Sequence, residues 1–494
     1  MQSSTNYSQF EKKENIVWPI FQPAENINNL PFWNKRPYLS FEENQILIKG
    51  YLKRIGKNKQ IPKAYMFILL KTGQLLYADK NQKGKIQLDL SIVLKKIELT
   101  NEENEDKQKI CAIRIERFQN CSIHIWNEDN LISINVWYNR LAQFCISQNF
   151  EGFFQLQEKI DQGAFSSVFS VTSQIQQEVV KNQKFAAKVY SKSLLQKIPA
   201  QQMKDFINAE CQILKIVKSQ YIVQLFEIIQ LEDVVILILE YVTGGTLYQV
   251  IQQNVLNELM SLEICYQILL AIKEVHHHGF VHRDIKLENI MISSLNPIEI
   301  KLIDFGFAEK INRNKLVNGS GTAGYIAPEL FELAPYTESC DMFSLGVLFY
   351  QLLCGNSPFG TQNKETLLEL NRTCNLQYLQ KEWQNISSST QKIVQKMLDK
   401  DPNKRITILE LELLLEIHIN NLRSNQANSR QALNQLQNCN NVMMQNQKTA
   451  IRLVSNNKKC DDDDMMIEEK SIDNTNLINL KNSQQYYNKS KWVS

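Results

Sequence analysis

The stretch that decides the fold is His282-Arg283-Asp284-Ile285-Lys286-Leu287-Glu288-Asn289, followed twenty residues after Asp284 by Asp304-Phe305-Gly306. Asp284 and Asn289 lie five residues apart in a loop, and Asp304 ends an alternating apolar run. Phosphoryl transfer from a nucleotide requires one carboxylate that orients the attacking hydroxyl and oxygen ligands that hold Mg2+ against the phosphates. The spacing of these three side chains therefore predicts a phosphoryl-transfer site.

Length and composition limit the remaining possibilities. The 494 residues are enough for two or three domains, each with its own core. The formal net charge of +3, from 55 basic and 52 acidic residues, argues against bulk attraction to nucleic acid, so we expect no nucleic-acid partner. Ten scattered cysteines without a CxxC pair indicate a reducing, cytoplasmic setting. We expect no transmembrane segment, because no apolar run reaches the roughly 20 residues needed to cross a bilayer.

Changes in composition divide the chain into four parts. Residues 1–43 are Asn-rich and interrupted by prolines, which predicts a loosely ordered leader. Residues 44–150 carry short apolar strands and end in one helix. Residues 153–422 change to strands, one helix, strands and then mostly helices. Residues 423–494 are rich in Asn and Gln, which predicts a disordered tail because such a segment cannot bury enough apolar surface.

The second part has the pattern of a small antiparallel β-barrel or sandwich with a C-terminal helix. Strands are expected at residues 46–52, 64–70, 74–78, 110–115 and 121–125. Trp137, Leu141 and Phe144 fall on one face of the closing helix. This arrangement resembles a pleckstrin-homology domain.

That resemblance implies a partner for the basic first strand and turn. In the pleckstrin-homology family such residues often bind phosphoinositide head groups, and this chain supplies Lys49, Lys53, Arg54, Lys57, Lys59 and Lys63. Two interpretations remain open. The patch either recruits the protein to the periphery of a membrane, or it is a solvated turn on a module that docks onto protein.

The third part resembles the protein kinases over about 270 residues. Gly163 lies between two strand-like runs, Lys188 lies on the next strand, and the stretches around Asp284 and Asp304 follow in the family's order. The resemblance implies an α+β fold with a small β-rich lobe and a larger helical lobe, here preceded by the barrel or sandwich. It also implies ATP and Mg2+ as cofactors and protein substrates with serine or threonine acceptors.

Family roles can be carried over position by position. Nucleotide contacts are implied for Ile160, Gly163, Val168, Ala186, Lys188, Leu239, Glu240 and Val242. Catalytic roles are implied for Asp284 as base and for Lys286, Lys188 and Glu210, and metal binding for Asn289 and Asp304. Lys188 would be held by Glu210, on a helix expected over residues 204–217.

Further motifs of the resemblance concern the choice of acceptor hydroxyl and the contacts that hold the catalytic segments in place. Lys286 and Thr322 favour aliphatic hydroxyls over phenols as acceptors, and Thr322 would bond Asp284. Glu329 would pair with Arg405, and Asp341 would hold the backbone of the catalytic loop. The catalytic part is most similar to the calcium/calmodulin-dependent group of serine/threonine kinases.

Two departures keep alternatives open. Asp161 and Ser166 stand where the family's phosphate lid usually has glycines, and a carboxylate near the nucleotide could repel phosphate. A pseudokinase scaffold, or a lipid- or protein-binding adaptor acting through residues 44–150, is therefore the rival interpretation.

Arg283 before the catalytic Asp implies that a phosphate or an acidic residue orders the activation loop. We expect phosphorylation of Ser320, or none at all, to set activity.

Overall fold

The computed structural model describes residues 41–56, 63–78, 83–100, 109–117, 121–127, 131–150, 153–163, 165–174, 183–192, 200–253, 256–311, 321–332, 337–361, 363–378 and 381–426. Several predictions fall elsewhere. The leader up to residue 40, the basic residues Lys57 and Lys59, the hydroxyl of Ser320 and the tail from residue 427 lie outside the described residues.

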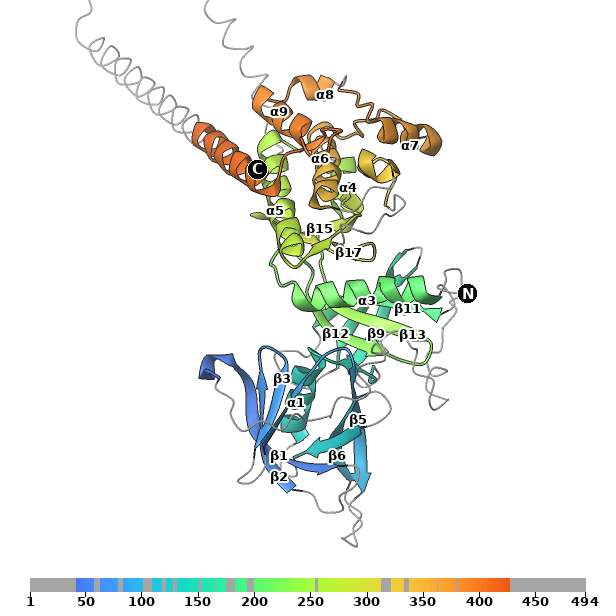
Figure 1. The fold of residues 1–494 in the computed structure, drawn as a ribbon, viewed down its shortest axis with the longest axis vertical. Helices are drawn as coiled ribbons and strands as arrows, with labels where there is room; N and C mark the ends of the chain where they lie inside the picture. Colours follow the sequence, from blue (N-terminus) through green and yellow to red (C-terminus); the bar gives the residue numbers. More distant parts are fainter. Residues whose placement is uncertain are drawn as a thin grey trace, which may run out of the picture. The chain divides into compact units, whose positions relative to one another are not determined.

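The amino-terminal elements, blue to teal in Figure 1, are antiparallel strands followed by one helix. After the 3-10 helix η4 (Glu43–Gln45) come β1 (Ile46–Gly56), β2 (Lys63–Leu70), β3 (Gln74–Ala78), β4 (Lys83–Gln87), β5 (Ile92–Thr100), β6 (Lys109–Arg117), β7 (Cys121–Trp126) and the helix α1 (Leu131–Ala142). The strands pair in the order β4-β3-β2-β1-β7-β6-β5. Tyr65, Phe67 and Leu69 alternate along β2 and are all buried, as expected for a strand with one face on a core.

Local patterns missed part of this arrangement. The strands β4 and β5 were not predicted, because lysines and glutamines interrupt their apolar residues. The prediction that Phe144 shares the helical face of Trp137 and Leu141 is wrong. The helix ends at Ala142, and Phe144 lies in the turn that follows, where its N–H donates to the Leu141 carbonyl at 3.0 Å.

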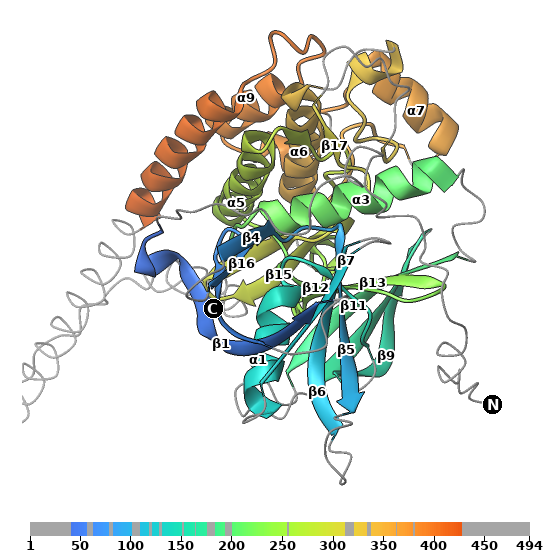
Figure 2. The same cartoon turned by 60° about the horizontal axis from the view of Figure 1, so that its bottom comes forward.

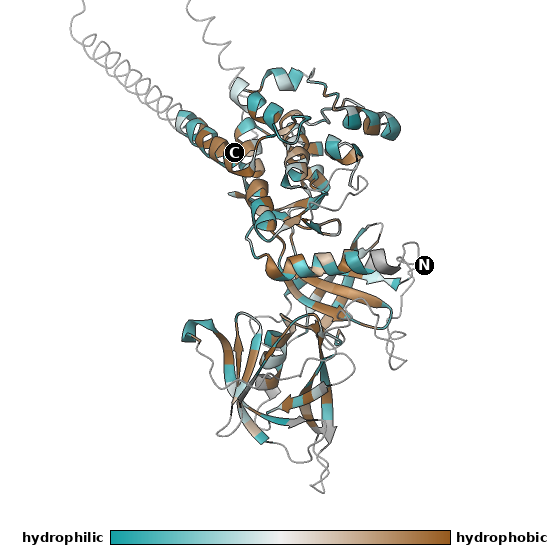
Figure 3. Ribbon diagram, in the orientation of Figure 1, coloured by the Kyte–Doolittle hydropathy of each residue, from teal (hydrophilic) through white to brown (hydrophobic). Residues whose placement is uncertain are grey.

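The small lobe is an antiparallel sheet with one long helix beside it. Its elements are β9 (Phe154–Gln162), β10 (Ser167–Ser173), β11 (Lys184–Ser191), α3 (Ala200–Ile216), β12 (Leu225–Gln230) and β13 (Val234–Glu240), with strand order β12-β13-β11-β10-β9. In Figures 1 and 2, α3 runs alongside these strands. The inner strand β13 is buried from Val234 to Leu239 and appears brown in Figure 3. A continuous apolar run therefore forms a core strand here.

One short strand joins the amino-terminal elements to the small lobe. The strand β8 (Ile146–Ser147) pairs in parallel with β5 on one side and with β12 on the other. Beside it, Lys215 near the end of α3 donates from Nζ to the Cys145 carbonyl at 3.4 Å. Strand pairing protects a sheet edge from other partners. The edge strand β12 of the small lobe is thus paired from within the chain.

A buried carboxylate lies at this junction. Glu227 on β12 accepts a hydrogen bond from Ser147 and lies near the Lys96 ammonium. Its Oε1 atom has no hydrogen-bond partner among the residues that the structure describes. Burial raises the pKa of Glu227 to about 7, against the opposing effects of Ser147 and Lys96. The junction therefore contains a carboxyl group that is easier to bury when protonated.

We expect Glu227→Gln to stabilise the chain at pH 8 and to have little effect at pH 5. The folded-state pKa of about 7 exceeds the ordinary value of 4.5, so the folded chain binds the proton more tightly. Stability is therefore lost as the pH rises from 4.5 through 7, and a shift of this size corresponds to about 3 kcal/mol at pH 8. Thermal unfolding at both pH values tests this, with the exposed Glu299→Gln as control. An equal gain at both pH values would contradict the account.

The large lobe is mostly helical. Its elements are α4 (Leu247–Gln253), α5 (Glu258–His277), β14 (Phe280–Val281), η5 (Leu287–Asn289), β15 (Ile290–Leu295), β16 (Ile298–Leu302), β17 (Glu309–Lys310), η6 (Pro328–Glu332), α6 (Glu338–Cys354), α7 (Lys364–Thr373), α8 (Lys381–Gln384), α9 (Ser388–Met397) and a helix over residues 408–426. The helices α5 and α6 pack together and supply much of the core. Among the described helices, none is both long and apolar enough to cross a bilayer. The predicted fold class, α+β with a β-rich lobe before a helical one, is confirmed.

Candidate active site

A buried lysine joins the small lobe to the start of the Asp304-Phe305-Gly306 segment. Lys188 lies on β11, where it is opposite Val168 of β10 and Leu237 of β13. Its Nζ lies 2.8 Å from Glu210 Oε1 and 2.7 Å from Asp304 Oδ1. The Glu210 side chain, on α3, is fully buried, and that of Lys188 is 8% exposed. One cation therefore connects β11, α3 and the segment after β16.

The pKa shifts in this triad follow from burial and mutual charge. Burial lowers the pKa of Lys188, but Asp304 and Glu210 outweigh it and hold that pKa well above its ordinary value. Burial raises the pKa of Glu210, and Lys188 only partly opposes this. For Asp304, burial also acts upward, but Lys188 and the Gly306 N–H bring the pKa down to about 2. Asp304 is thus held as an anion beside an ammonium.

A second cluster surrounds Asp284, which is buried. Its Oδ1 accepts a hydrogen bond from Thr322 Oγ1 at 2.6 Å. Its Oδ2 lies 2.7 Å from Lys286 Nζ and 2.9 Å from Asn289 Nδ2. Lys286 also donates to Thr322 Oγ1 at 3.0 Å, which closes a ring of contacts. The structure brings Asp284, Lys286 and Asn289 together, and Thr322 joins them from 38 residues downstream.

The backbone before Asp284 is held by a buried carboxylate on α6. Asp341 accepts hydrogen bonds from the N–H groups of His282 and Arg283, each at 2.8 Å. Its Oδ2 also accepts from His276 Nε2 at 2.7 Å. Burial raises the pKa of Asp341, but these donors, His276 above all, lower it below the ordinary value. The catalytic loop therefore has a fixed starting point, as expected for Asp341.

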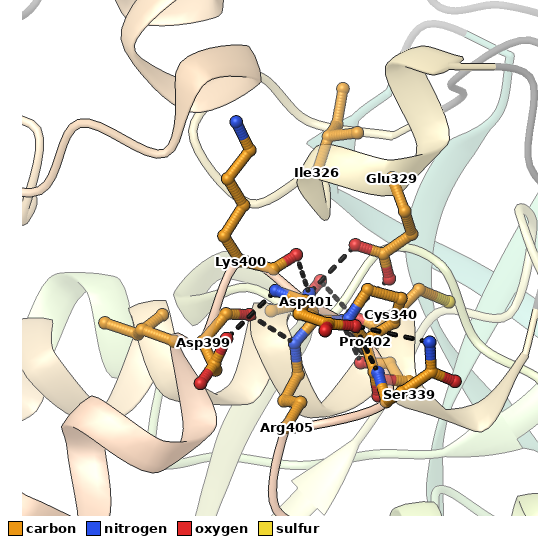
Figure 4. A network of polar contacts seen from close by, with 12 residues as sticks. Ile326, Glu329, Ser339, Cys340, Asp399, Lys400, Asp401, Pro402 and Arg405 are labelled. Atoms are coloured by element: carbon orange, nitrogen blue, oxygen red, sulfur yellow. Dashed lines mark hydrogen bonds and ion pairs between the residues drawn. The ribbon is translucent and has the colours of Figure 1, made fainter.

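A bidentate ion pair supports the segment downstream of Thr322. Arg405 Nη1 and Nη2 lie 2.7 and 2.8 Å from the two oxygens of Glu329, and the Arg405 side chain is fully buried. Figure 4 shows this network, in which Arg405 also donates to the carbonyls of Ser339 and Asp399. Because every donor points at an acceptor, the desolvated guanidinium is compensated. The pair that the sequence suggested between Glu329 and Arg405 is present.

The residues expected to contact a nucleotide line the strands around Lys188. Ala186 is opposite Leu239 across the β11–β13 ladder, so both stand at one end of it. At the turn after β9, the N–H of Gly163 donates to the Ser166 carbonyl at 2.9 Å. Ile160 is 46% exposed. These positions stay predictions as nucleotide contacts.

Three further positions near the expected nucleotide site, Glu240, Val242 and Asp161, differ in their contacts and exposure. Glu240, at the end of β13, pairs through its side chain with Lys301 at 3.0 Å, and its N–H donates to the Gln224 carbonyl at 2.9 Å. Val242 follows in the connection to α4 and is partly exposed. Asp161 is exposed, and its Oδ1 accepts from the Gln162 N–H at 2.7 Å.

The predicted Mg2+ ligands fit an ion held mainly by phosphate oxygens. The contacts of Asp304 to Lys188 and to the Gly306 N–H both use Oδ1. Asn289 uses its Nδ2 to reach Asp284, so its amide oxygen can face a cation. No cluster of three or more His, Cys, Asp or Glu able to hold a metal occurs among the described residues. Two protein ligands supplemented by phosphate and water are the usual pattern for Mg2+.

Some contacts of the site were not predicted. Tyr190 lies two positions after Lys188 on β11, and its hydroxyl donates to Glu210. Phe206 on α3 contacts the rings of Phe165 and Phe307, which places it between the phosphate lid and the segment after Asp304. His276, in the last turn of α5, donates to Asp341. An alternating strand pattern could have placed Tyr190 on the side of Lys188, but nothing local pointed to the contacts of Phe206 or His276.

Comparison with known proteins agrees with this geometry. The family model described as "Protein kinase domain" matches residues 154–413. A probable serine/threonine-protein kinase 2 of Plasmodium falciparum is 31% identical over 291 residues, which are 56% of this chain and 55% of that protein. A probable myosin light chain kinase of Dictyostelium discoideum is 30% identical over 266 residues, which are 53% of this chain and 74% of that protein. The chain thus spans little more than half of the Plasmodium relative.

Proposed function

The chain belongs to the protein kinase family, and we propose that it is a serine/threonine kinase that transfers the γ-phosphoryl group of ATP to hydroxyls of protein substrates. The observation that carries the proposal is the closed ring of contacts around Asp284. It places a buried carboxylate, an ammonium and a hydroxyl within 3.0 Å of one another. A general base and a positive charge for the transferring group are what this reaction needs.

The residues of the two clusters have separate parts in the proposed reaction. Asp284 orients the acceptor hydroxyl and takes its proton as the oxygen bonds to the γ-phosphorus and the bond to ADP breaks. Lys286 neutralises the negative charge on the transferred group. Lys188, held by Glu210, binds the α- and β-phosphates. Mg2+, when bound by Asn289 and Asp304, supplies further charge neutralisation for the phosphates.

The preference for serine and threonine rests on Lys286 and Thr322. Lys286 Nζ contacts both Asp284 and Thr322. The side chains of Lys286 and Thr322 therefore narrow the space beside Asp284. The hydroxyl of a serine or threonine lies on a short side chain and can reach Asp284 in this space. A tyrosine has to insert its whole ring to bring its hydroxyl to Asp284. The Plasmodium relative is named as a serine/threonine-protein kinase, which supports this class. We also propose that the catalytic part is most similar to the calcium/calmodulin-dependent group.

Transfer of labelled γ-phosphate to matched peptides tests the proposal. The peptides share one flanking sequence and differ only in a central serine, threonine or tyrosine. We expect label on serine and threonine and at most a small fraction on tyrosine. Binding of ATP without transfer to any peptide would instead support a pseudokinase scaffold.

We further propose that residues 44–150 are a pleckstrin-homology-like module that docks within the chain, in a cytoplasmic setting that suits its cysteines. The pairing of β8 with β12 supports docking onto the small lobe. Two residues of the basic patch have neighbours within the chain, since the exposed Lys49 lies 3.7 Å from Glu43 and Arg54 lies over the Tyr77 ring. Sedimentation with phosphoinositide vesicles separates this from a lipid adaptor, which would require the chain to bind them.

A further inference from the structure

The arginine before the catalytic aspartate is paired with a carboxylate from the same chain. Arg283 Nη1 lies 2.5 Å from Glu309 Oε2, and its Nε donates to the Phe307 carbonyl at 2.6 Å. The two side chains are 11% and 23% exposed, so the pair is largely shielded from solvent. A shielded guanidinium needs a counter-charge, because an unpaired buried ion is strongly unfavourable. Glu309 supplies one.

Strand pairing determines where Glu309 lies. The strand β17 runs antiparallel to β14, with Glu309 opposite Val281 and Lys310 opposite Phe280. The N–H of Ile311 donates to the Gly279 carbonyl at 2.8 Å and extends the same ladder. Arg283 follows two residues after Val281, so this register brings the Glu309 carboxylate within reach of its guanidinium. The pairing of β14 with β17 therefore fixes the backbone positions from which the two side chains meet.

Arg283 is held at both its backbone and its side chain. Its N–H donates to Asp341 at 2.8 Å, and it adopts a positive φ of 66°, which is unusual for a residue other than glycine. Such a conformation persists only where the surroundings hold it. Asp284 comes next in the chain, so the position of the base depends on these contacts.

We propose that Glu309 is a positioning residue that supplies from within the chain the negative charge required by Arg283, so that the catalytic loop is ordered without a phosphate on residues 312–320. In many switches a phosphate orders a segment by pairing with arginine, and a carboxylate already in place performs the same electrostatic task. The inference rests on the proposed kinase activity. The inference favours the expectation that activity needs no phosphorylation of Ser320.

The test compares phosphatase-treated chain with chain variants. Full-length protein is treated with a broad-specificity phosphatase, and mass spectrometry verifies that residues 305–322 carry no phosphate. We expect the treated native chain to keep its kcat within about twofold of the untreated one. We expect Glu309→Gln to lower kcat by roughly tenfold or more and to change the KM for ATP little, because the contacts around Lys188 are untouched. Glu309→Asp, which keeps the charge, should recover part of the loss.

Controls separate positioning from a general loss of structure. Glu299→Gln removes an exposed carboxylate from β16 of the same lobe and should leave kcat unchanged. Thermal unfolding monitors whether Glu309→Gln still folds. If that variant does not fold, the phosphatase comparison on the native chain still tests whether a phosphate is needed. Loss of native activity on dephosphorylation, or an equal kcat for Glu309→Gln and Glu299→Gln, overturns the inference. No activity in any form of the native chain overturns the proposed function instead.

Discussion

Asp284→Asn is expected to lower kcat for phosphoryl transfer about 10²- to 10⁴-fold while ATP binding changes little. Both carboxylate oxygens of Asp284 accept hydrogen bonds, from Thr322 on one side and from Lys286 and Asn289 on the other. An amide is nearly the same size, but it has no anionic oxygen to take a proton. It also presents an NH2 group to neighbouring donors, which disturbs the ring. The variant therefore removes the base and keeps the volume.

The measurement separates chemistry from binding. Initial rates at varied ATP and peptide concentrations give kcat and KM, and calorimetry gives the affinity for the nucleotide. Asp233→Asn is a matched control, because Asp233 is a half-exposed partner of Lys192 at 3.8 Å. We expect that control to retain native kcat. Equal kcat for Asp284→Asn and the native chain would remove Asp284 from the proposed mechanism.

Lys188→Met is expected to reduce kcat/KM roughly 10²- to 10³-fold, because it removes a positive charge from the phosphate site. It should also destabilise the chain by about 3–5 kcal/mol, since the fully buried Glu210 then loses its counter-ion. The loss should shrink at low pH. Burial already raises the pKa of Glu210, so this carboxyl can take up a proton once Lys188 is absent.

A second substitution distinguishes the two effects of Lys188→Met. The double variant Lys188→Met/Glu210→Gln removes both charges of the buried pair. We therefore expect it to regain much of the lost thermal stability and none of the activity. Lys192→Met is the matched control, because Lys192 lies four residues further on and is half exposed beside Asp233. Full activity in Lys188→Met, or a double variant less stable than the single one, would contradict the role of the pair.

The two active-site clusters differ in how much of each can be predicted from the spacing of residues in the sequence. Asp284, Lys286 and Asn289 lie within six residues of one another, so their common loop was evident from spacing alone. Lys188 and Glu210 lie on separate elements, and only the resemblance to a family suggested that they meet. The structure places Lys188 Nζ 2.8 Å from Glu210 Oε1, because α3 lies beside the sheet that carries β11. Long-range pairing of this kind leaves no local periodicity to read.

Other contacts had no signal in the sequence. The bridge made by β8 involves only Ile146 and Ser147, too short a run to show an alternating pattern. The contact between His276 and Asp341 spans 65 residues, and the contact between Arg283 and Glu309 depends on the pairing of β14 with β17, each two residues long. Such pairs are selected by the packing of whole elements, which places side chains near one another regardless of their spacing.

The sequence by itself indicated the class of fold and the order of its lobes, and its resemblance to a family predicted which side chains are chemically active. The pattern of strands and helices follows from local periodicity, which is visible within a window of a few residues. The tertiary structure decided how charges are compensated: Glu210 and Asp304 with Lys188, and Glu309 with Arg283. Charge compensation in a low-dielectric interior depends on distances of a few ångströms across separate elements, and only the packed chain sets those distances.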